Sequence, residues 1–324
     1  MSSGTAVTPA WLSEPMRLLA AAHAAGRMPH ALLLHAAAGR GGEWLAIWTA
    51  ELVLCKARTQ PRPCGSCPGC LRAREMRHPD LLAVGLPEES QQIRIDEVRA
   101  LGAELQLTSH EGGYKVAIIA PADALNRFAA NALLKTLEEP PARTLLVLVA
   151  AQPSRLPATL RSRCQRIAVP SPSRAQALAW LEGSRGPGPW SAVLDLIGEA
   201  PFAAAELDPA AVARLCEETR RLLEEMRSGT ADPVTTAERW ARSELALRLA
   251  CVENWLTERI RRGLGAATDA TELGASAHSR SPDSVMNTRR LFASLEGARE
   301  LKAALATPIN RALALESVLR SMRA

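Results

Sequence analysis

Aromatic residues are scarce in this chain of 324 residues, where Phe, Trp and Tyr together make up 3%. Single-stranded nucleic acids are commonly bound by stacking on aromatic side chains, so the composition argues against such a surface. Long apolar runs are also absent from the sequence: none approaches the roughly 20 residues of a membrane-spanning helix, and the N-terminus lacks the pattern of a signal peptide. These absences predict a cytoplasmic protein that does not enter a membrane.

Lysine is the second scarce residue, since it occurs only four times, as Lys56, Lys115, Lys135 and Lys302. The net charge of +5 and the pI of about 9.0 therefore come almost wholly from arginine. A basic chain of this kind can contact phosphate backbones. Because alanine is abundant as well, the arginine content reads as a compositional bias as much as a selected surface, and strong direct binding of nucleic acid is not predicted.

The first half of the chain alternates strand-like and helix-like segments, which predicts a parallel, doubly wound sheet. Short apolar runs predict buried strands, and apolar residues at helical spacing predict the segments between them. The predicted strands are 31–35, 81–84, 115–120 and 145–149, and the predicted helices include 44–54, 96–107 with Asp96 at its N-cap, and one that ends near Glu139. We therefore expect an α/β domain over residues 1–169.

Beyond the segment Pro170-Ser-Pro-Ser173 the character of the sequence changes to helical patterns. Two short helices, 174–182 and 192–197, flank a linker rich in Gly and Pro, and they predict a small helical domain over 170–207. Residues 208–324 predict an all-α domain with helices at 211–226, 237–262, 288–306 and 309–322, and a loop over 265–283.

Four of the seven cysteines lie close together in the sequence, within residues 55–70. Cys64, Cys67 and Cys70 follow one another at a spacing of two intervening residues, among Gly and Pro that form turns. Such turns bring sulfurs to tetrahedral distances, and Cys55 supplies a fourth thiolate, so the pattern predicts a structural zinc site without an open position for catalysis.

Other readings of this cysteine cluster are a redox pair, an iron–sulfur cluster or disulfides. A cytoplasmic setting disfavours disulfides. An iron–sulfur motif of the ferredoxin type would continue with a further Cys-Pro, which this sequence lacks. The remaining cysteines, Cys164, Cys216 and Cys251, are expected to be small buried hydrophobic residues.

A glycine-rich loop follows the first predicted strand, where a nucleotide-binding protein carries its P-loop. A working P-loop needs Gly at its first and sixth positions, followed by Lys for the phosphates and Ser or Thr for Mg²⁺. Here those four positions hold Ala36, Gly41, Gly42 and Glu43. A carboxylate at the start of the following helix would repel a triphosphate, although it suits the helix dipole.

The acidic residues of an ATPase are missing as well. Such a protein ends the strand at 115–119 with Asp-Glu, for Mg²⁺ and for water activation, but Ala120 and Pro121 stand there. Asp123 is the nearest carboxylate, and it is expected to cap a helix. The double loss predicts that the chain does not hydrolyse ATP.

The segment Asn131–Pro141 belongs to a predicted amphipathic helix that begins before it, has Phe128 and Leu133 on its apolar face, and is stopped by Pro140. Arg163 follows the next strand, and we expect it just beyond that strand's end, where open α/β sheets place functional groups. On the residues alone, a surface salt bridge is the simplest interpretation of Arg163.

Taken together, these motifs resemble the delta-prime family of subunits of the bacterial DNA polymerase III clamp loader, which have the AAA+ fold. The resemblance rests on several segments in this order: Pro29–Leu33, the four cysteines, His78-Pro79-Asp80, Asn131–Pro141, Leu160–Cys164 and Pro308–Arg311. It covers essentially the whole chain. The resemblance implies an AAA+ P-loop-type sheet domain, a small helical lid domain and a helical collar domain that holds the oligomer together.

The resemblance also implies a role as the ATP-inert, non-catalytic subunit of a DNA-directed DNA polymerase holoenzyme, a nucleotidyltransferase at the level of the complex. Its implied partners are the delta and gamma/tau subunits, through the collar and AAA+ interfaces, and through the complex the sliding clamp and primed DNA. Arg163 would then serve as an arginine finger in trans, stabilising the γ-phosphate of ATP bound by the neighbouring gamma/tau subunit.

Two other functions are compatible with parts of the sequence. An active gamma-type AAA+ ATPase would share the cysteine cluster and the Ser-Arg-Cys motif, but Gly42 and Glu43 speak against it. A zinc-dependent nucleic-acid binder would use a basic helix after the cysteines, with Arg72, Arg74 and Arg77. The sequence leaves open whether this chain touches DNA directly.

Overall fold

The computed structural model describes residues 7–57, 61–87, 90–272, 282–305, 307 and 309–322. The chain forms two compact units, which are treated separately. The first comprises Met1–Gly186 with Glu199–Ala205, and the second comprises Pro187–Gly198 with Glu206–Ala324. Among the described residues, no helix is both long and apolar enough to cross a membrane.

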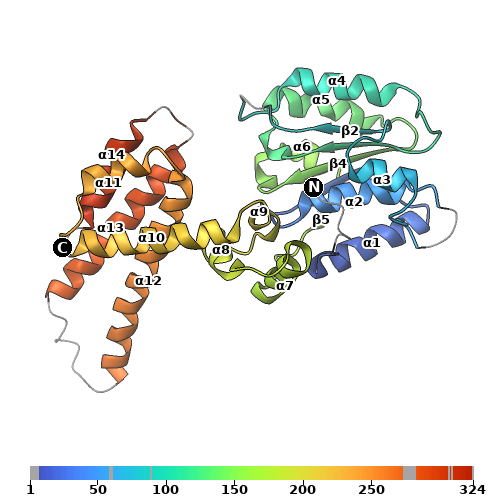
Figure 1. Ribbon diagram of the computed structural model, residues 1–324. Helices are drawn as coiled ribbons and strands as arrows, with labels where there is room; N and C mark the ends of the chain where they lie inside the picture. Colours follow the sequence, from blue (N-terminus) through green and yellow to red (C-terminus); the bar gives the residue numbers. More distant parts are fainter. Residues whose placement is uncertain are drawn as a thin grey trace. The chain divides into compact units, whose positions relative to one another are not determined.

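A five-stranded parallel sheet forms the centre of the first unit, in the order β2-β3-β4-β1-β5 (Figure 1). Four of its strands are those that the apolar runs predict, and β5 is added at the edge beside β1. The strands are β1 (Ala31–His35), β2 (Leu81–Val84), β3 (Lys115–Ile119), β4 (Thr144–Ala150) and β5 (Gln165–Ala168). The expected α/β fold with a parallel sheet is confirmed.

The two faces of the sheet are covered by different helices because side chains alternate along each strand. Leu32 and Leu34 of β1 face α1 (Ser13–Ala24) and α2 (Gly42–Leu54), whereas Ala31 and Leu33 face the opposite layer. That layer consists of α4 (Ile95–Gln106), α5 (Arg127–Glu138) and α6 (Ala158–Arg161), and Figure 1 shows α4 and α5 across the sheet from α1 and α2. Burial on both faces explains why the strands read as continuous apolar runs.

The remaining helical segments of this unit are short or lie at its edges. They are η1 (Ala10–Leu12), α3 (Pro68–Arg74), η2 (Ala122–Ala124), η3 (Pro153–Arg155), α7 (Arg174–Arg185) and α9 (Pro201–Ala204). Helix α3 belongs to the cysteine segment and packs against α2. Helices α7 and α9 contact each other.

The second unit is all-α, as predicted. Its helices are α8 (Trp190–Ile197), α10 (Pro209–Arg227), α11 (Pro233–Trp240), α12 (Leu245–Glu272), α13 (Pro282–Ala304) and α14 (Arg311–Ser321). Helices α10, α11, α12, α13 and α14 share one hydrophobic core. In it, the indole of Trp240 is fully buried among leucines of α12 and α14. The predicted domain boundaries at 169/170 and 207/208 stay predictions.

Several local predictions were wrong, each for a physical reason. The helix expected over 237–262 is two helices, because Glu244 takes a left-handed backbone with φ of 53° between α11 and α12. The loop expected from Gly265 is helical as far as Glu272, and residues 273–281 lie outside the described residues. Pro308 of the C-terminal motif also lies outside them, while Asn310 caps α14 by accepting from the Leu313 amide.

Two capping predictions and one burial prediction were also wrong. The N-cap of α4 is Arg94, so Asp96 lies in the first turn. Asn126, not Asp123, caps α5, accepting from the Ala129 amide at 2.8 Å. Phe128, expected on the apolar face, is 68% exposed because that face of α5 is completed by Ala129 and Ala130 instead.

Candidate functional site

The degenerate phosphate loop runs from the carboxyl end of β1 to the first turn of α2, as its sequence predicts. Gly41 caps α2 with a left-handed backbone at φ of 101°, and Glu43 is exposed in the first helical turn. Gly42, in the position of the phosphate-binding lysine, is packed tightly: a Cβ there would lie 2.5 Å from the Ala36 Cβ and 2.8 Å from Val149 Cγ1. A side chain at position 42 is therefore excluded while Ala36 occupies the first position.

Aromatic side chains cover the loop from the other side. Phe202 of α9 donates its amide to the Gly39 carbonyl at 2.9 Å, and the Trp11 indole donates to the Arg40 carbonyl at 2.9 Å. A Cβ on Gly41 would lie 2.7 Å from the Phe202 ring, which itself contacts the Trp180 ring at a tilt of 40° with centroids 4.4 Å apart. The backbone of the loop is thus bonded to and packed against the protein. The sequence showed the missing catalytic residues but not this cover, because α9 lies some 160 residues further along the chain.

The carboxyl ends of β3 and β4 lie on the same side of the sheet as the loop, and they lack the acidic residues of an ATPase, as the sequence predicts. Ala120 and Pro121 follow β3, and Ala150 ends β4. The carboxylate of Asp123 accepts a hydrogen bond from the Gln152 amide at 2.8 Å. This hydrogen bond joins the segment after β3 to the segment after β4. Asp123 therefore makes a structural contact and does not form the predicted helix cap.

Arg163 lies at the amino edge of the sheet, where the parallel strands begin, opposite the carboxyl edge that carries the phosphate loop. It lies two residues before β5, which begins at Gln165 opposite Leu32, near the start of β1, whereas the phosphate loop begins where β1 ends. At a rise of about 3.3 Å per residue, the two sites are separated by roughly 15–20 Å along the strands. The prediction that Arg163 stands at the carboxyl edge was wrong, because α6 returns the chain to the amino edge before β5 begins.

The Arg163 guanidinium is held by neighbours in the chain. Nη2 lies 2.7 Å from Glu138 Oε1, and Nη1 donates to the Thr159 carbonyl at 2.9 Å. The arginine side chain is 37% exposed and that of Glu138 is 50% exposed. This is the surface salt bridge that the residues alone suggested, and an exposed pair of this kind contributes about 0–1 kcal/mol. Glu138 is the partner that sequence reasoning did not single out, because its side chain sits 25 positions earlier.

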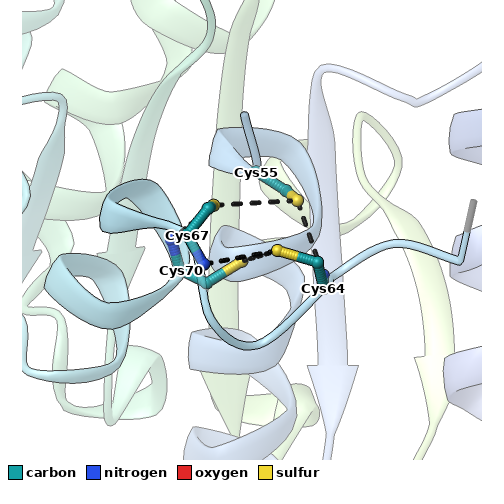
Figure 2. Close-up of side chains that lie close together, drawn as sticks. All are labelled: Cys55, Cys64, Cys67 and Cys70. Carbon is teal, nitrogen blue, oxygen red and sulfur yellow. Dashed lines mark hydrogen bonds between the residues drawn. The ribbon is translucent and has the colours of Figure 1, made fainter. Parts of the chain in front are cut away.

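The four cysteines of the predicted metal site come together between α2 and α3 (Figure 2). All four Sγ atoms lie within 4.8 Å of one another, and the pairs Cys64–Cys70 and Cys55–Cys67 are each 4.0 Å apart. Two sulfurs bound to one zinc ion at ~2.3 Å with tetrahedral angles are about 3.8 Å apart. The group can therefore hold a metal ion with little movement.

Backbone amides point at these sulfurs. The amides of Lys56 and Cys70 both approach Cys67 Sγ, at 3.4 and 3.5 Å, and the amide of Cys67 approaches Cys64 Sγ at 3.4 Å. Backbone hydrogen bonds from Ser66 and Cys67 lower the pKa of Cys64 to about 6, whereas burial raises the pKa of Cys70. Four neighbouring thiols cannot all ionise without a compensating cation, which makes the group suited to a cation that binds thiolates.

Two arginines of α3, Arg72 and Arg74, form ion pairs with other parts of the unit, and Arg77 just after the helix forms a local one. Arg72 pairs with Glu111, Arg74 with Glu51 at 2.7 Å and Arg77 with Glu75 at 2.6 Å. The close approach of α3 to α2 requires glycine at position 69, because a Cβ there would overlap the Leu54 carbonyl oxygen. The three arginines that a nucleic-acid binder would use are thus each matched by a carboxylate.

The motif His78-Pro79-Asp80 has a structural role next to this module. The buried carboxylate of Asp80 accepts hydrogen bonds from the Ser109 hydroxyl at 2.9 Å and from the amides of His110 and Glu111 at 2.7 and 3.1 Å. Although burial raises its pKa, these donors hold it below the ordinary value of 3.8. Asp80 therefore fixes the loop that precedes β3, including the Glu111 that pairs with Arg72.

Of the other three cysteines, Cys164 is buried in the core as predicted. Cys251 is also buried as predicted, whereas Cys216 is half-buried, and the two contact each other with their Sγ atoms 2.9 Å apart. This pair could not be predicted from the sequence, because the two residues are 35 positions apart on different helices.

Comparison with known proteins identifies the family. The family model described as "DNA polymerase III, delta subunit" matches residues 11–173. A DNA polymerase III subunit delta' of Pseudomonas aeruginosa is 38% identical over 218 residues, 65% of each protein, and one of Yersinia pestis is 39% identical over 171 residues, 53% of this chain and 50% of the relative. A DNA polymerase III subunit tau of Salmonella typhimurium is 34% identical over 139 residues, 43% of this chain and 21% of the relative.

These similarities span half to two thirds of the length of the two delta' relatives. The family match likewise runs from η1 to the segment after β5 and takes in half of the chain. The chain therefore belongs to the DNA polymerase III delta subunit family.

Proposed function

We propose that this protein is the ATP-inert, delta-prime-like subunit of a DNA polymerase III clamp loader, which assists in loading the sliding clamp onto primed DNA during replication. Its partners would be a delta subunit and gamma/tau subunits, contacted through the AAA+ unit and the helical collar. The relatives are delta' subunits, and the phosphate loop of this chain lacks the lysine and the hydroxyl that bind a triphosphate and Mg²⁺. Gly42 is packed too tightly for a lysine side chain, and Phe202 and Trp11 bind the loop backbone, which supports a loop that does not hold a triphosphate.

The single observation that carries the proposal is the position of Arg163. It lies at the opposite edge of the sheet from the loop of its own chain, so it cannot serve a nucleotide in cis. An exposed guanidinium at that edge can reach a nucleotide held by a neighbouring subunit. There it would act as an arginine finger, stabilising the charge that develops on the γ-phosphate.

Arg163 would have two states, one paired with Glu138 and one bound to a neighbour's nucleotide, and their energies are compatible with this role. Leaving Glu138 costs about 0–1 kcal/mol, because both side chains are substantially exposed. An arginine finger accelerates hydrolysis by on the order of 10³-fold or more, which corresponds to roughly 4 kcal/mol. The salt bridge would then hold Arg163 until a neighbour's nucleotide competes for it.

The cysteine group would bind zinc as a structural ion. Four thiolates complete a tetrahedral shell, so such an ion would have no free position for substrate or water and would stabilise the junction of α2 and α3. Elemental analysis of protein purified without chelator tests this assignment. We expect one zinc per chain, and its absence would contradict the assignment.

The alternative, an active gamma-type ATPase, requires nucleotide binding by the isolated chain. The loop residues Ala36, Gly42 and Glu43 speak against it, and the tau relative matches a smaller share of the chain than the delta' relatives do. A nucleotide-binding measurement on the isolated chain distinguishes the two functions.

The experiment that tests the proposed role is reconstitution with delta and gamma/tau subunits, followed by measurement of ATPase activity stimulated by clamp and primed DNA. Arg163→Ala should reduce both the ATPase and clamp loading while assembly and zinc content stay unchanged. Arg155→Ala, which removes an exposed arginine of the same unit beyond β4, is the matched control and should behave as the unsubstituted chain. Full activity of the Arg163→Ala complex would refute the trans role.

A further inference from the structure

The pair formed by Cys216 and Cys251 lies in the helical unit, far in sequence from the metal module. Cys216 is on α10 and Cys251 is on α12, and both are free thiols with their Sγ atoms 2.9 Å apart. We propose that these two residues are a redox modification site: peroxide oxidises Cys216, and Cys251 then closes a reversible disulfide that joins α10 to α12.

The distance between the two sulfurs supports this chemistry. Nonbonded heavy atoms attract best at about 3.5–4.0 Å, and a disulfide bond is about 2.04 Å long. The separation of 2.9 Å between the two Sγ atoms is shorter than a nonbonded contact and longer than a disulfide bond, so bond formation needs a movement of less than about 1 Å.

The same distance argues against a second metal site. Two sulfurs on one tetrahedral ion are about 3.8 Å apart, which is close to the 4.0 Å found in the cysteine module but not to the separation of this pair. Within the part of the chain that the structure describes, the four cysteines of that module are the one group of three or more such ligands close enough for a metal.

A cavity of about 90 Å³ gives access to the pair from the surface, and Arg220 lines it together with both cysteines. A cavity of that size has room for a small oxidant such as hydrogen peroxide. Cys216 is half-buried beside this cavity, whereas Cys251 is only 7% exposed.

The electrostatics assign the two thiols different roles. The hydrogen bond with Cys251 lowers the pKa of Cys216, and the charge of Arg220 lowers it further. The same hydrogen bond and burial raise the pKa of Cys251. Because the thiolate is the nucleophile, Cys216 reacts first and Cys251 resolves the product.

The reaction balances with hydrogen peroxide as the only oxidant. The Cys216 thiolate attacks one oxygen of hydrogen peroxide, and the O–O bond breaks. Hydroxide departs, and Cys216 becomes a sulfenic acid. Cys251 Sγ then attacks Cys216 Sγ; the S–O bond breaks, and the departing hydroxyl takes the Cys251 proton as water. In sum, two thiols and one peroxide give one disulfide and two water molecules.

The bond would clamp two helices of the same core. It closes a loop of 35 residues that contains α11, and loops of this size restrict the unfolded chain considerably. We expect the melting temperature of the helical unit to rise by about 10 °C on oxidation and to return on reduction.

Peptide mapping tests the proposal on the full, zinc-loaded chain. After treatment with a few equivalents of hydrogen peroxide and alkylation of remaining thiols, trypsin should release peptides 215–220 and 249–259, each with a single cysteine. We expect these two as a linked species that dithiothreitol separates. In Cys251→Ser, dimedone should label Cys216, because the sulfenic acid can no longer be resolved.

The controls separate this pair from the other cysteines. Cys216→Ser should abolish both the linked species and the shift in melting temperature, and Cys164→Ser, the matched removal of a third cysteine outside the metal module, should leave both intact. The proposal is overturned if peptides 215–220 and 249–259 remain fully alkylated. It is equally overturned if the only linked peptides come from residues 55–70.

Discussion

The packing of Gly42 against Ala36 yields a prediction about stability with a defined sign. Replacing a helical glycine by alanine ordinarily stabilises a protein by about 0.5–1 kcal/mol, because glycine loses more backbone entropy on folding. Gly42→Ala should do the opposite. Its new Cβ would lie 2.5 Å from the Ala36 Cβ and 2.8 Å from Val149 Cγ1, and both neighbours belong to the buried centre of the sheet unit.

The magnitude follows from overpacking, which costs about 1–3 kcal/mol for an added methyl group in a well-packed core. Subtracting the entropic gain leaves a loss of about 1–2 kcal/mol for Gly42→Ala. Ala36→Gly should cost a similar amount by itself, because it removes a buried methyl group and adds backbone freedom. In the double substitution the contact between the two positions is relieved, so we expect a favourable coupling energy of about 1 kcal/mol.

Urea unfolding of the four chains of this double-mutant cycle measures the free energies. Gly102→Ala is the matched control, because Gly102 lies within helix α4 and its added Cβ would meet Thr136 Oγ1 at an ordinary 3.7 Å. It should stabilise the protein. If Gly42→Ala stabilises to the same extent, the packing argument for the closed phosphate loop is refuted.

Three further predictions concern the cysteine module, Asp80 and Arg163. Gly69→Ala should lower the zinc content and the resistance of the bound zinc to chelators, because the added Cβ meets the Leu54 backbone carbonyl, which cannot move away. In the control Gly113→Ala, the added Cβ would have open space among the described residues, so elemental analysis should find the zinc retained. Asp80→Asn should lower the free energy of unfolding by about 1–3 kcal/mol at neutral pH, because it weakens the acceptor of three hydrogen bonds. Because the folded pKa of Asp80 lies below 3.8, the stabilisation by its carboxylate is present above pH 3.8 and is lost as the pH falls through the folded pKa. The difference between Asp80→Asn and the unsubstituted chain should therefore shrink in urea titrations below pH 3.8, and a difference that does not shrink with falling pH would contradict this. Glu138→Ala should change the free energy of unfolding by less than about 1 kcal/mol, and a larger loss would mean that the pair with Arg163 is structural.

Much of the sheet unit was predictable because its signals are local. Strands buried on both faces read as uninterrupted apolar runs, and Pro140 marks the end of α5 within a residue or two. The capping residues were harder, since Asp123 and Asn126 are both plausible caps, and only the position of Gln152 decides that Asp123 bonds elsewhere. In the helical unit, the break at Glu244 was missed because a left-handed backbone at a glutamate leaves no mark in the hydrophobic pattern.

The metal module was predictable for the same reason. Its ligands lie within 16 residues, and the spacing of Cys64, Cys67 and Cys70 dictates turns that gather their sulfurs whatever the rest of the chain does. The edge of the sheet on which Arg163 lies was not predictable from its neighbours in sequence. It depends on the path of α6 and on the register of β5 against β1.

By itself, the sequence determined which chemical groups the protein has: four thiols at metal-binding spacing, a phosphate loop without lysine or hydroxyl, and an arginine in a Ser-Arg-Cys motif. The tertiary structure decided what these groups meet. It covers the loop with Phe202, places Arg163 with Glu138 at the opposite edge, and brings Cys216 to Cys251. These contacts join residues 25 to more than 160 positions apart, and such pairings are fixed by the packing of whole helices and strands rather than by local propensity.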